Sequence, residues 1–219
     1  MKNYNEILKN CILFKDISED ELQGLLSCLG ARVVCFDKSY TVFAEGSRAK
    51  YLGILLCGSV QVIQIDYYGN RSIISSPAVG EVFAEEFACA GISEIPVSVI
   101  ANEESEIMLI DCDRILHTCQ KGCGFHQRII YNLMQVLAYK NISFHKKIDI
   151  TSKRSTRDKL LTYLMHEAKK ATGNEFEIPF DRQELADYLE VDRSGLSAEI
   201  SKLRREGAIE CRKNKFMLL

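Results

Sequence analysis

Residues 180–203 constrain the fold of this chain more than any other stretch. They read FDRQELADYLEVDRSGLSAEISKL, and they contain two helix starts close together. Asp181 can accept hydrogen bonds from free amides at the first start, and Glu184, three residues later, can complete a capping box. Asp192 can cap the second helix, which leaves only Glu190-Val191 for the turn. The pattern predicts a helix-turn-helix, although two packed helices at the edge of another domain would give a similar signature.

The second helix of such a motif enters the major groove of DNA, and its N-terminal residues face the base edges. Neighbouring basic and polar side chains contact phosphates and hold the motif in register on the duplex. The predicted DNA contacts are Arg182, Gln183, Asp192, Arg193, Ser194, Gly195, Ser197, Lys202 and Lys213.

The composition is that of a globular protein with one large or two small domains. The chain has 219 residues, of which 47% are hydrophobic, and no apolar stretch approaches the roughly 20 residues that a membrane span needs. The start MKNYNEILKN lacks the apolar core of a secretory signal, so we expect a cytoplasmic protein with no membrane partner. Residues 151–219 carry a formal charge of +2 and the first 150 carry −4, which agrees weakly with phosphate contact by the C-terminal part.

Nine cysteines are spread along the chain, and without an export signal most are expected to be reduced core residues. One cluster stands out, and it consists of Cys112, Cys119 and Cys123 with His117 and His126 nearby. It lacks the paired C-x2-C spacing of structural zinc sites, so no metal site is predicted.

Short β-rich runs broken by turn residues fill residues 31–111, after an N-terminal helix with a capping box at Ser18 and Glu21. Many short strands at this spacing predict a sandwich or a barrel. One small helix is expected at 84–89. The strands precede the helical C-terminal part, so the fold class is α+β.

A long helix is predicted from residue 125 to residue 148. Five apolar residues and one asparagine follow one another along it at alternating steps of four and three, the a/d spacing of a two-helix seam. The predicted dimer-interface residues are Ile130, Met134, Leu137, Asn141, Phe144 and Ile148. Asn141 favours the seam, because a single polar residue at such a position fixes the register of a dimer. A lone helix packed on its own domain is the alternative, and the residues that follow predict a hinge at 149–153.

The end of the chain predicts further parts of a DNA-binding domain. Ser155 and Asp158 form a third capping box. The last residues, AIECRKNKFMLL, predict two strands around Lys213-Asn214-Lys215. A basic hairpin of this kind forms a wing beside DNA.

With these parts in this order, the chain resembles the Crp/Fnr family of bacterial transcription regulators over nearly its full length. The residues that carry the likeness are Gly46, Gly58-Ser59-Val60, the cassette Gly80 to Phe87, RQELADYL and VDRSGLS. The resemblance implies a double-stranded β-helix, jelly-roll-like and related to cyclic-nucleotide-binding domains, at residues 1–124. It implies a dimerisation helix and hinge at 125–150 and a winged helix-turn-helix at 151–219.

The cassette departs from the family pattern where a cyclic nucleotide would bind. Members that bind cyclic AMP use a Gly-Glu pair, and an Arg-Ser or Arg-Thr pair that neutralises the phosphate. This chain has Ala84-Glu85 and Pro96-Val97 at these places. A buried anion would lack its counter-charge, so we expect no tight binding of cyclic AMP or cyclic GMP. The effector and any cofactor are unidentified, and the predicted pocket consists of Phe83, Glu85, Glu86 and Phe87.

The recognition helix departs from the family as well. Related proteins often read guanine through two arginines about five residues apart. Arg193 fits the first position, but Ala198 occupies the second, so the half-site should differ from the best-known family consensus. Glu190 stands in the turn where glycine is common.

The sequence therefore predicts a homodimeric, sequence-specific DNA-binding regulator that reads a near-palindromic site. An unidentified effector in the roll would control it, and the resemblance implies RNA polymerase as a partner. The alternative is a redox- or metal-responsive regulator of the same architecture that uses Cys112, Cys119 and Cys123. The iron-sulfur members of the family have cysteines clustered near the N-terminus, whereas the cysteines here are dispersed: Cys11, Cys28 and Cys35.

An enzyme of cupin-like form is disfavoured. A cupin would need histidine and carboxylate ligands on its strands. None of the four histidines lies in the strand-rich region, since they are His117, His126, His145 and His166. No catalytic residues are predicted.

Overall fold

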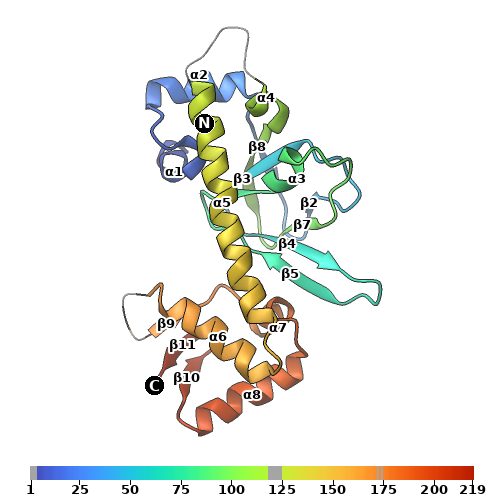
Figure 1. Ribbon diagram of the computed structural model, residues 1–219, viewed down its shortest axis with the longest axis vertical. Coiled ribbons are helices and arrows are strands. Elements are labelled where there is room, and N and C mark those ends of the chain that lie inside the picture. The colour runs from blue at the N-terminus through green and yellow to red at the C-terminus, as the bar shows by residue number, and fades with distance from the viewer. Residues whose placement is uncertain (1–3, 118–124, 172, 174) are drawn as a thin grey trace. The chain divides into compact units, whose positions relative to one another are not determined.

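The computed structural model describes residues 4–117, 125–171, 173 and 175–219 (Figure 1). The chain divides into two compact units, and the division falls within the long helix α5 (Phe125–Thr151). The first unit contains residues 1–68 and 74–141, and the second contains residues 69–73 and 142–219. The predicted boundaries at 124 and 150 treat this helix as a separate segment, whereas its two halves belong to different units. None of the helices in the described part of the chain is long and apolar enough to cross a membrane.

The N-terminal helices close one end of the first unit. They are α1 (Asn5–Asn10), the 3-10 helix η1 (Ile12–Phe14) and α2 (Glu19–Cys28). The predicted capping box begins α2, where the backbone N–H of Ser18 donates to the Glu21 carboxylate at 3.0 Å. Three acidic residues lie in the first turn of α2, where the helix dipole favours them.

Two antiparallel four-stranded sheets form the roll, which confirms the predicted double-sheet architecture. One sheet has the order β1 (Arg32–Phe36), β8 (Ser105–Asp111), β3 (Tyr51–Cys57) and β6 (Val82–Phe83). The other has the order β2 (Thr41–Phe43), β7 (Ser98–Ala101), β4 (Val60–Ile65) and β5 (Arg71–Ser75). The short helices α3 (Glu85–Cys89) and α4 (Cys112–Leu116) follow β6 and β8.

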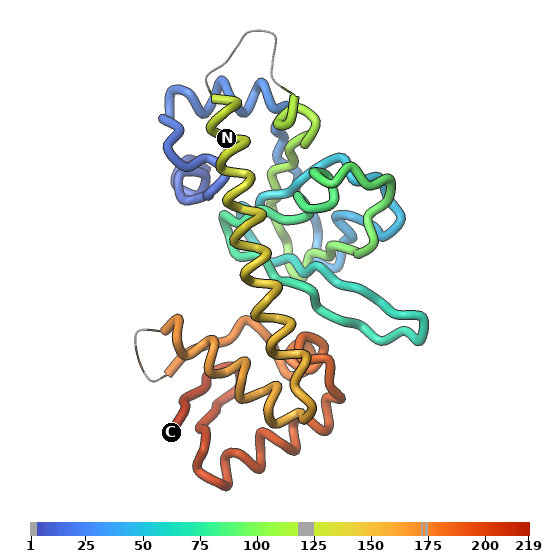
Figure 2. The backbone as a smooth tube through the Cα atoms, in the orientation of Figure 1, coloured from blue at the N-terminus to red at the C-terminus, as the bar shows by residue number. Residues whose placement is uncertain are grey.

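Strand β3 shows how the first unit is layered. Successive side chains of a strand point to opposite faces of its sheet. Leu52, Ile54 and Leu56 pack with the N-terminal helices and α5, whereas Leu55 packs between the two sheets. The first unit therefore has a helix layer and two sheet layers, with the blue N-terminal segment beside the start of α5 in Figure 2.

Helix α5 packs its N-terminal half on the first unit through Ile129, Leu133 and Val136, which are buried. Asn132 on the same face is 1% exposed, and its amide donates to the carbonyls of Leu13 at 3.0 Å and Lys15 at 2.8 Å. A buried amide needs such partners, so Asn132 fixes where α5 crosses the N-terminal helices.

The second unit contains the end of α5, three further helices and a small sheet. The helices are α6 (Thr156–Ala168), α7 (Arg182–Leu189) and α8 (Arg193–Arg205). The sheet has the order β10 (Ile209–Arg212), β11 (Lys215–Leu218) and β9 (Glu175–Glu177), and all its pairs are antiparallel.

The connection between α5 and α6 is shorter than the predicted hinge at 149–153. Helix α5 continues to Thr151, whose hydroxyl donates to the Lys147 carbonyl at 3.0 Å. The Lys153 ammonium donates to the Asp149 carboxylate at 2.8 Å, which supports the last turn of α5. Ser155 then caps α6 by accepting from the Asp158 N–H at 3.0 Å, so residues 152–155 join the helices. The predicted capping box is half formed, because the Asp158 carboxylate accepts from the Ser155 hydroxyl at 2.6 Å rather than from its backbone N–H.

Candidate nucleic-acid interface

The helix-turn-helix consists of α7 and α8, as the sequence predicted. Its apolar stripes meet in the core of the second unit, and the buried residues are Leu185, Ala186, Leu189, Leu196, Ile200 and Leu203. Ala186 is fully buried, and its small side chain permits the close contact of the two helices. Tyr163 of α6 completes the core with Phe180 and Tyr188, whose ring centroids are 4.8 Å apart. The apolar stripe of α8 points inward, so its polar residues are left on the outer face.

Side-chain caps fix both helix starts. The Glu184 N–H donates to Asp181 at 2.8 Å, and the Asp181 N–H donates to Glu184 at 2.8 Å, which confirms the capping box. At the start of α8, Asp192 accepts from the Ser194 hydroxyl and from the Gly195 N–H at 2.8 Å. These hydrogen bonds, that of Ser194 first, hold the pKa of Asp192 below its ordinary value.

The turn between the helices has a left-handed residue, although the sequence has no glycine there. Glu190 has φ 54° and ψ 55°, a conformation that costs a side-chain-bearing residue about 1 kcal/mol. Lys159 of α6 donates to the carbonyls of Leu189 and Glu190 at 3.2 Å each. Lys147 of α5 donates to the carbonyl of Tyr188 and lies 3.7 Å from the centre of its ring. The two lysines therefore satisfy the carbonyls that the end of α7 leaves free.

Replacing Glu190 with glycine should stabilise the second unit by about 0.5 to 1 kcal/mol, because glycine adopts the left-handed conformation without strain. Thermal unfolding of the variant would measure the gain. Glu190→Ala is the matched control, since it removes the same charge without relieving the strain. An equal gain for both variants would attribute the effect to charge and contradict the explanation by strain.

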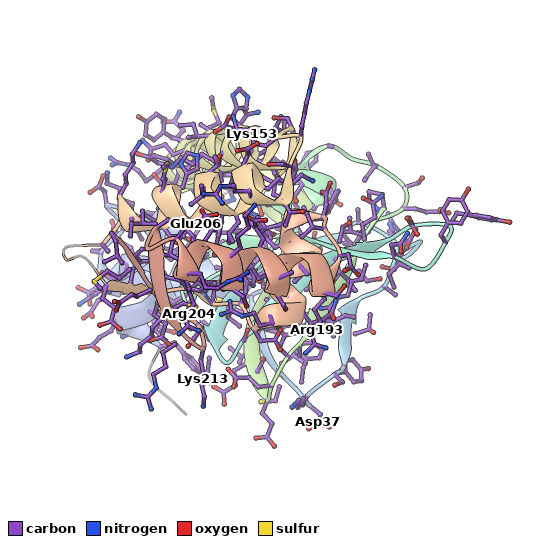
Figure 3. The ribbon with its side chains drawn as sticks, turned by 90° about the horizontal axis from the view of Figure 1, so that it is seen from below. Asp37, Lys153, Arg193, Arg204, Glu206 and Lys213 are labelled. Carbon is purple, nitrogen blue, oxygen red and sulfur yellow. The ribbon has the colours of Figure 1, made fainter. Side chains whose placement is uncertain are left out.

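The N-terminal part of α8 presents its polar residues outward. Arg193, Ser194 and Ser197 are exposed, and no side-chain partner of Arg193 is found among the described residues. The Ser197 hydroxyl donates to the Arg193 carbonyl at 2.9 Å. Figure 3 looks onto α8, with Arg193 near its N-terminal end and Arg204 near its other end. An exposed arginine at the start of this helix has the position from which base edges are read.

Several of the predicted DNA contacts make interactions within the protein, and Arg182, Gln183 and Asp192 are among them. The Arg182 guanidinium lies 5.2 Å from the centre of the Phe216 ring and 3.6 Å from Cys211 Sγ, so it joins α7 to the hairpin. Gln183 donates to Asp187 at 2.8 Å. Asp192 is the helix cap, and it already accepts the N–H of Gly195. DNA contact by these residues stays a prediction, and each would have to add it to the interaction it already makes.

The predicted wing is the hairpin of β10 and β11, with Lys213 and Asn214 between the paired residues Arg212 and Lys215. Lys213 is exposed and has φ 55°. The Asn214 amide donates to Glu177 at 2.8 Å, which anchors the turn to β9. The hairpin therefore holds exposed Lys213 at a fixed tip.

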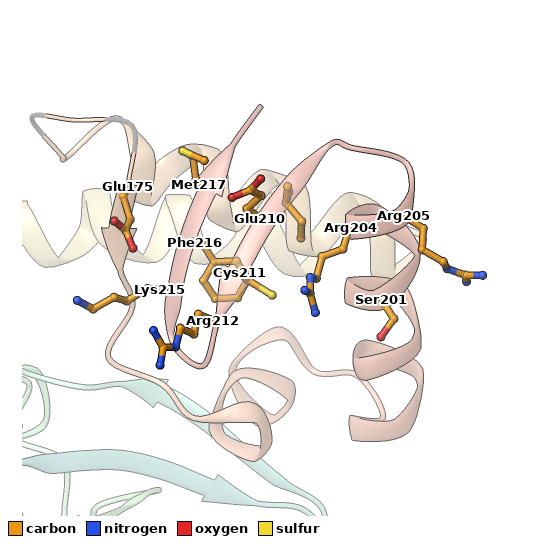
Figure 4. Close-up of a pocket in the computed structure, with 11 residues that line it drawn as sticks. Glu175, Ser201, Arg204, Arg205, Glu210, Cys211, Arg212, Lys215, Phe216 and Met217 are labelled. Carbon is orange, nitrogen blue, oxygen red and sulfur yellow. The ribbon is translucent and has the colours of Figure 1, made fainter.

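A groove of about 710 Å³ lies between α8 and the hairpin, and its lining includes Arg204 and Arg212, which were not among the predicted DNA contacts. Figure 4 shows Arg204 pointing into this space and Arg212 and Lys215 at the hairpin end, and Arg205 also lines the groove at the end of α8. Glu175 and Glu210 also line it, so its charge is mixed. The sequence signals were the Arg204-Arg205 pair at the end of the apolar stripe and the run RKNK in the hairpin.

Most of the predicted seam lies beside the face of α5 that packs on the first unit, but Ile130 packs against the core of that unit. Met134 is 63% exposed, Ile148 is 62% exposed, and Asn141 is exposed. The other three predicted residues are half-buried: Ile130, Leu137 and Phe144. This single chain therefore leaves Met134, Asn141 and Ile148 exposed and the other three residues partly exposed, at the spacing that a two-helix seam uses.

The residues of the predicted effector pocket lie together on β6 and α3. Their side chains pack in the core of the first unit or form ion pairs within it. The Phe83 ring is fully buried and lies over Gly53, where any side chain would overlap it. The Glu85 carboxylate is fully buried and binds the Lys140 ammonium of α5 at 2.7 Å, and Glu86 lies 3.7 Å from the same ammonium. Phe87 packs against the core between the sheets. Ligand binding by this pocket stays a prediction.

The predicted cysteine cluster is only partly described. Cys112 is buried, but Cys119 and Cys123 lie outside the described residues. Within the described ranges, no group of three or more histidine, cysteine, aspartate or glutamate side chains is placed to hold a metal ion. His126 is 2% exposed, and its Nε2 lies 3.3 Å from the Arg114 carbonyl.

Comparisons with known proteins match both parts of the chain. Residues 158–219 match the profile of Crp-like helix-turn-helix domains, and residues 33–121 match the profile of cyclic nucleotide-binding domains. A probable transcriptional activator from Rhizobium leguminosarum bv. viciae is 24% identical over 179 residues, which cover 77% of this chain and 69% of that protein. The cGMP-dependent protein kinase 2 of Mus musculus is 23% identical over 224 residues, which cover 99% of this chain but only 28% of the kinase.

A solved structure agrees with the fold. The c-di-GMP responsive global regulator CLP of Xanthomonas campestris has a TM-score of 0.74 at 18% identity, covering 90% of this chain and 97% of that chain. The predicted α+β fold, with a β-roll followed by a winged helix-turn-helix, is confirmed.

Proposed function

Because the chain belongs to the Crp/Fnr family of transcription regulators, we propose that it is a homodimer that binds a near-palindromic DNA site. The observation that carries the proposal is the outer face of α8, where exposed Arg193 stands beside Ser194 and Ser197. The helix is positioned by its core stripe and by the Asp192 cap, so these residues are held in place before DNA arrives. An arginine held at this point of the helix suits a bidentate contact to a base edge in the major groove.

Phosphate contacts would come from around this helix. Lys202 of α8 and Lys213 of the wing are exposed, and Arg204 and Arg212 line the groove between them. Contacts of this kind provide affinity and register without reading sequence. The start of α8 would therefore select the DNA sequence, and the end of α8 and the wing would provide affinity for DNA of any sequence.

The uncovered stripe on α5 supports the homodimer. Met134 and Ile148 are more than half exposed and lie at seam positions together with Asn141. Pairing this stripe with a second copy would bury it and give the protein a two-fold axis. The two recognition helices would then read half-sites about 34 Å apart, one turn of DNA.

The signal is proposed to be something other than cyclic AMP, since Pro96-Val97 stands where the phosphate-binding pair would be. We expect no catalysis, because the match to the kinase covers only 28% of that protein. We also propose that RNA polymerase is a partner. A cytoplasmic location, where DNA is available, is part of the same proposal.

Selection of bound sequences from random DNA tests the proposal. The unmodified protein is expected to recover two inverted half-sites about one helical turn apart. Met134→Glu should sediment as a monomer, because two like charges would meet in the seam, and it should bind the selected site at least about tenfold more weakly.

Tyr139→Glu is the matched control, since Tyr139 is 58% exposed but lies off the predicted seam of α5. This variant should remain dimeric and keep the affinity for the selected site. If the unmodified protein sedimented as a monomer, or recovered a single half-site without symmetry, the dimer proposal would be wrong.

A further inference from the structure

Two thiols that are distant in sequence meet in the first unit. Cys89 Sγ and Cys112 Sγ are 3.2 Å apart, and neither cysteine is in a disulfide. Cys89 is the last residue of α3, and Cys112 is the first residue of α4, directly after β8. The cassette and the end of the sheet therefore place two thiols in direct contact.

The environments of the two thiols differ in a way that suits stepwise oxidation. Cys112 is 1% exposed, whereas Cys89 is half-buried. The hydrogen bond from Cys112 lowers the pKa of Cys89, although burial and the carboxylates of Glu85 and Glu86 oppose this effect. The same contact with Cys89 raises the pKa of Cys112, as does its burial. Cys89 is thus the thiol that ionises first and is open to a small oxidant, because the thiolate is the nucleophile.

We propose that Cys89 and Cys112 are a redox-active dithiol site that closes to a reversible disulfide when a small peroxide reaches Cys89. The Cys89 thiolate attacks hydrogen peroxide, its S–O bond forms as the O–O bond breaks, and hydroxide leaves. The Cys112 sulfur, losing its proton to that hydroxide, attacks the sulfenic acid, and the second oxygen leaves as hydroxide. This hydroxide takes up the proton that Cys89 released on ionising and becomes the second water. Two thiols and one peroxide thus become one disulfide and two waters, and a dithiol reductant reverses the reaction by exchange.

The position of the pair gives the disulfide a structural effect. A disulfide needs about 2.05 Å between its sulfurs, so closing it draws the end of α3 toward the end of β8. Helix α3 begins with Glu85, which binds Lys140 on α5 at 2.7 Å. Oxidation is therefore transmitted to the helix that carries the predicted seam. An effect on DNA binding rests on the proposed function, whereas formation of the disulfide does not.

This site differs from the one that the sequence predicted. Cysteine spacing pointed to Cys112 with Cys119 and Cys123. The fold places Cys112 beside Cys89, which stands alone in the sequence and was assigned to no site. Spacing along the chain gives no sign of this contact.

Peroxide treatment of the full chain, followed by alkylation and peptide mapping without reductant, tests the site. We expect a Cys89–Cys112 linkage that dithiothreitol removes. Cys89→Ser and Cys112→Ser should each abolish it, and Cys57→Ser should retain it, since Cys57 is an exposed cysteine at the end of β3.

Linkage of Cys112 to Cys119 or Cys123 would overturn the assignment, as would Cys89 and Cys112 staying reduced while exposed Cys57 is oxidised. The mapping on the unmodified chain does not depend on whether a variant folds. A parallel DNA-binding titration separates the two proposals. A mapped disulfide in a protein that binds no DNA would support this site and refute the proposed function.

Discussion

Lys140→Met is expected to destabilise the first unit by about 3 to 5 kcal/mol at neutral pH, because it leaves a buried carboxylate without its cation. The Glu85 side chain has 0% exposure, and its carboxylate is 2.7 Å from the Lys140 ammonium. Its other oxygen, Oε1, has no hydrogen-bond partner among the described residues, so Lys140 provides much of its compensation. Methionine keeps a long apolar stem, which limits the loss of packing. Urea unfolding of the variant and the unmodified protein measures the difference.

The loss should depend on pH in a defined direction. Burial raises the pKa of Glu85 above its ordinary 4.5, and the charge of Lys140 opposes the rise. Removing Lys140 raises this pKa further. A carboxyl group whose pKa is raised by folding contributes stability below its unfolded-state pKa, and this stability is lost as the pH rises through the folded-state pKa. The variant should therefore be closest to the unmodified protein near pH 4.5 and differ most at neutral pH.

Adding Glu85→Gln to Lys140→Met provides the control, because the neutral amide removes the unpaired charge. The double variant should recover part of the loss at neutral pH and show little dependence on pH. If Lys140→Met cost the same free energy at pH 5 and pH 7.5, the stem of Lys140 rather than its charge would stabilise this region, and the explanation would fail.

The local parts of this protein were predictable, because their signals lie within a few residues. The Asp181–Glu184 box, the Asp192 cap and the Ser155 cap all have donor and acceptor within one turn of helix. The strands of the roll alternate apolar residues on two faces, as in β3. Periodicity also predicted α5, although its end at Thr151 depends on contacts that involve Asp149 and Lys153.

The contacts that tie elements together were not predictable, because they join residues far apart in sequence. Lys140 and Glu85 are 55 residues apart, and Cys89 and Cys112 are 23 apart. Arg182 was predicted to contact DNA, and no pattern in the sequence indicated that its guanidinium lies over Phe216. A charge or thiol in the sequence indicates chemistry, but only the fold decides which partner it meets. The same limit applies to the groove, where Arg204 and the wing come together.

Arg193→Ala is expected to weaken binding to the preferred DNA site by about 1 to 3 kcal/mol, or roughly 5- to 150-fold. Arg193 is exposed at the start of α8, where a guanidinium can reach the two acceptors of a guanine. Because the lost contact is to a base, the variant should also discriminate less at one position of each half-site. Competition binding with sites substituted at each position, at fixed salt, measures both effects.

Arg205→Ala is the matched control, since it removes an exposed arginine from the last turn of the same helix. Arg205 is the last residue of α8, at the opposite end from Arg193, so its removal should leave base preference unchanged. The dependence of affinity on salt separates the two kinds of contact, because each lost phosphate contact lowers the slope of log K against log salt by about 1. If Arg193→Ala weakened all sequences equally and lowered this slope, Arg193 would contact a phosphate. Base reading would then have to come from the remaining polar residues of α8, Ser194 and Ser197.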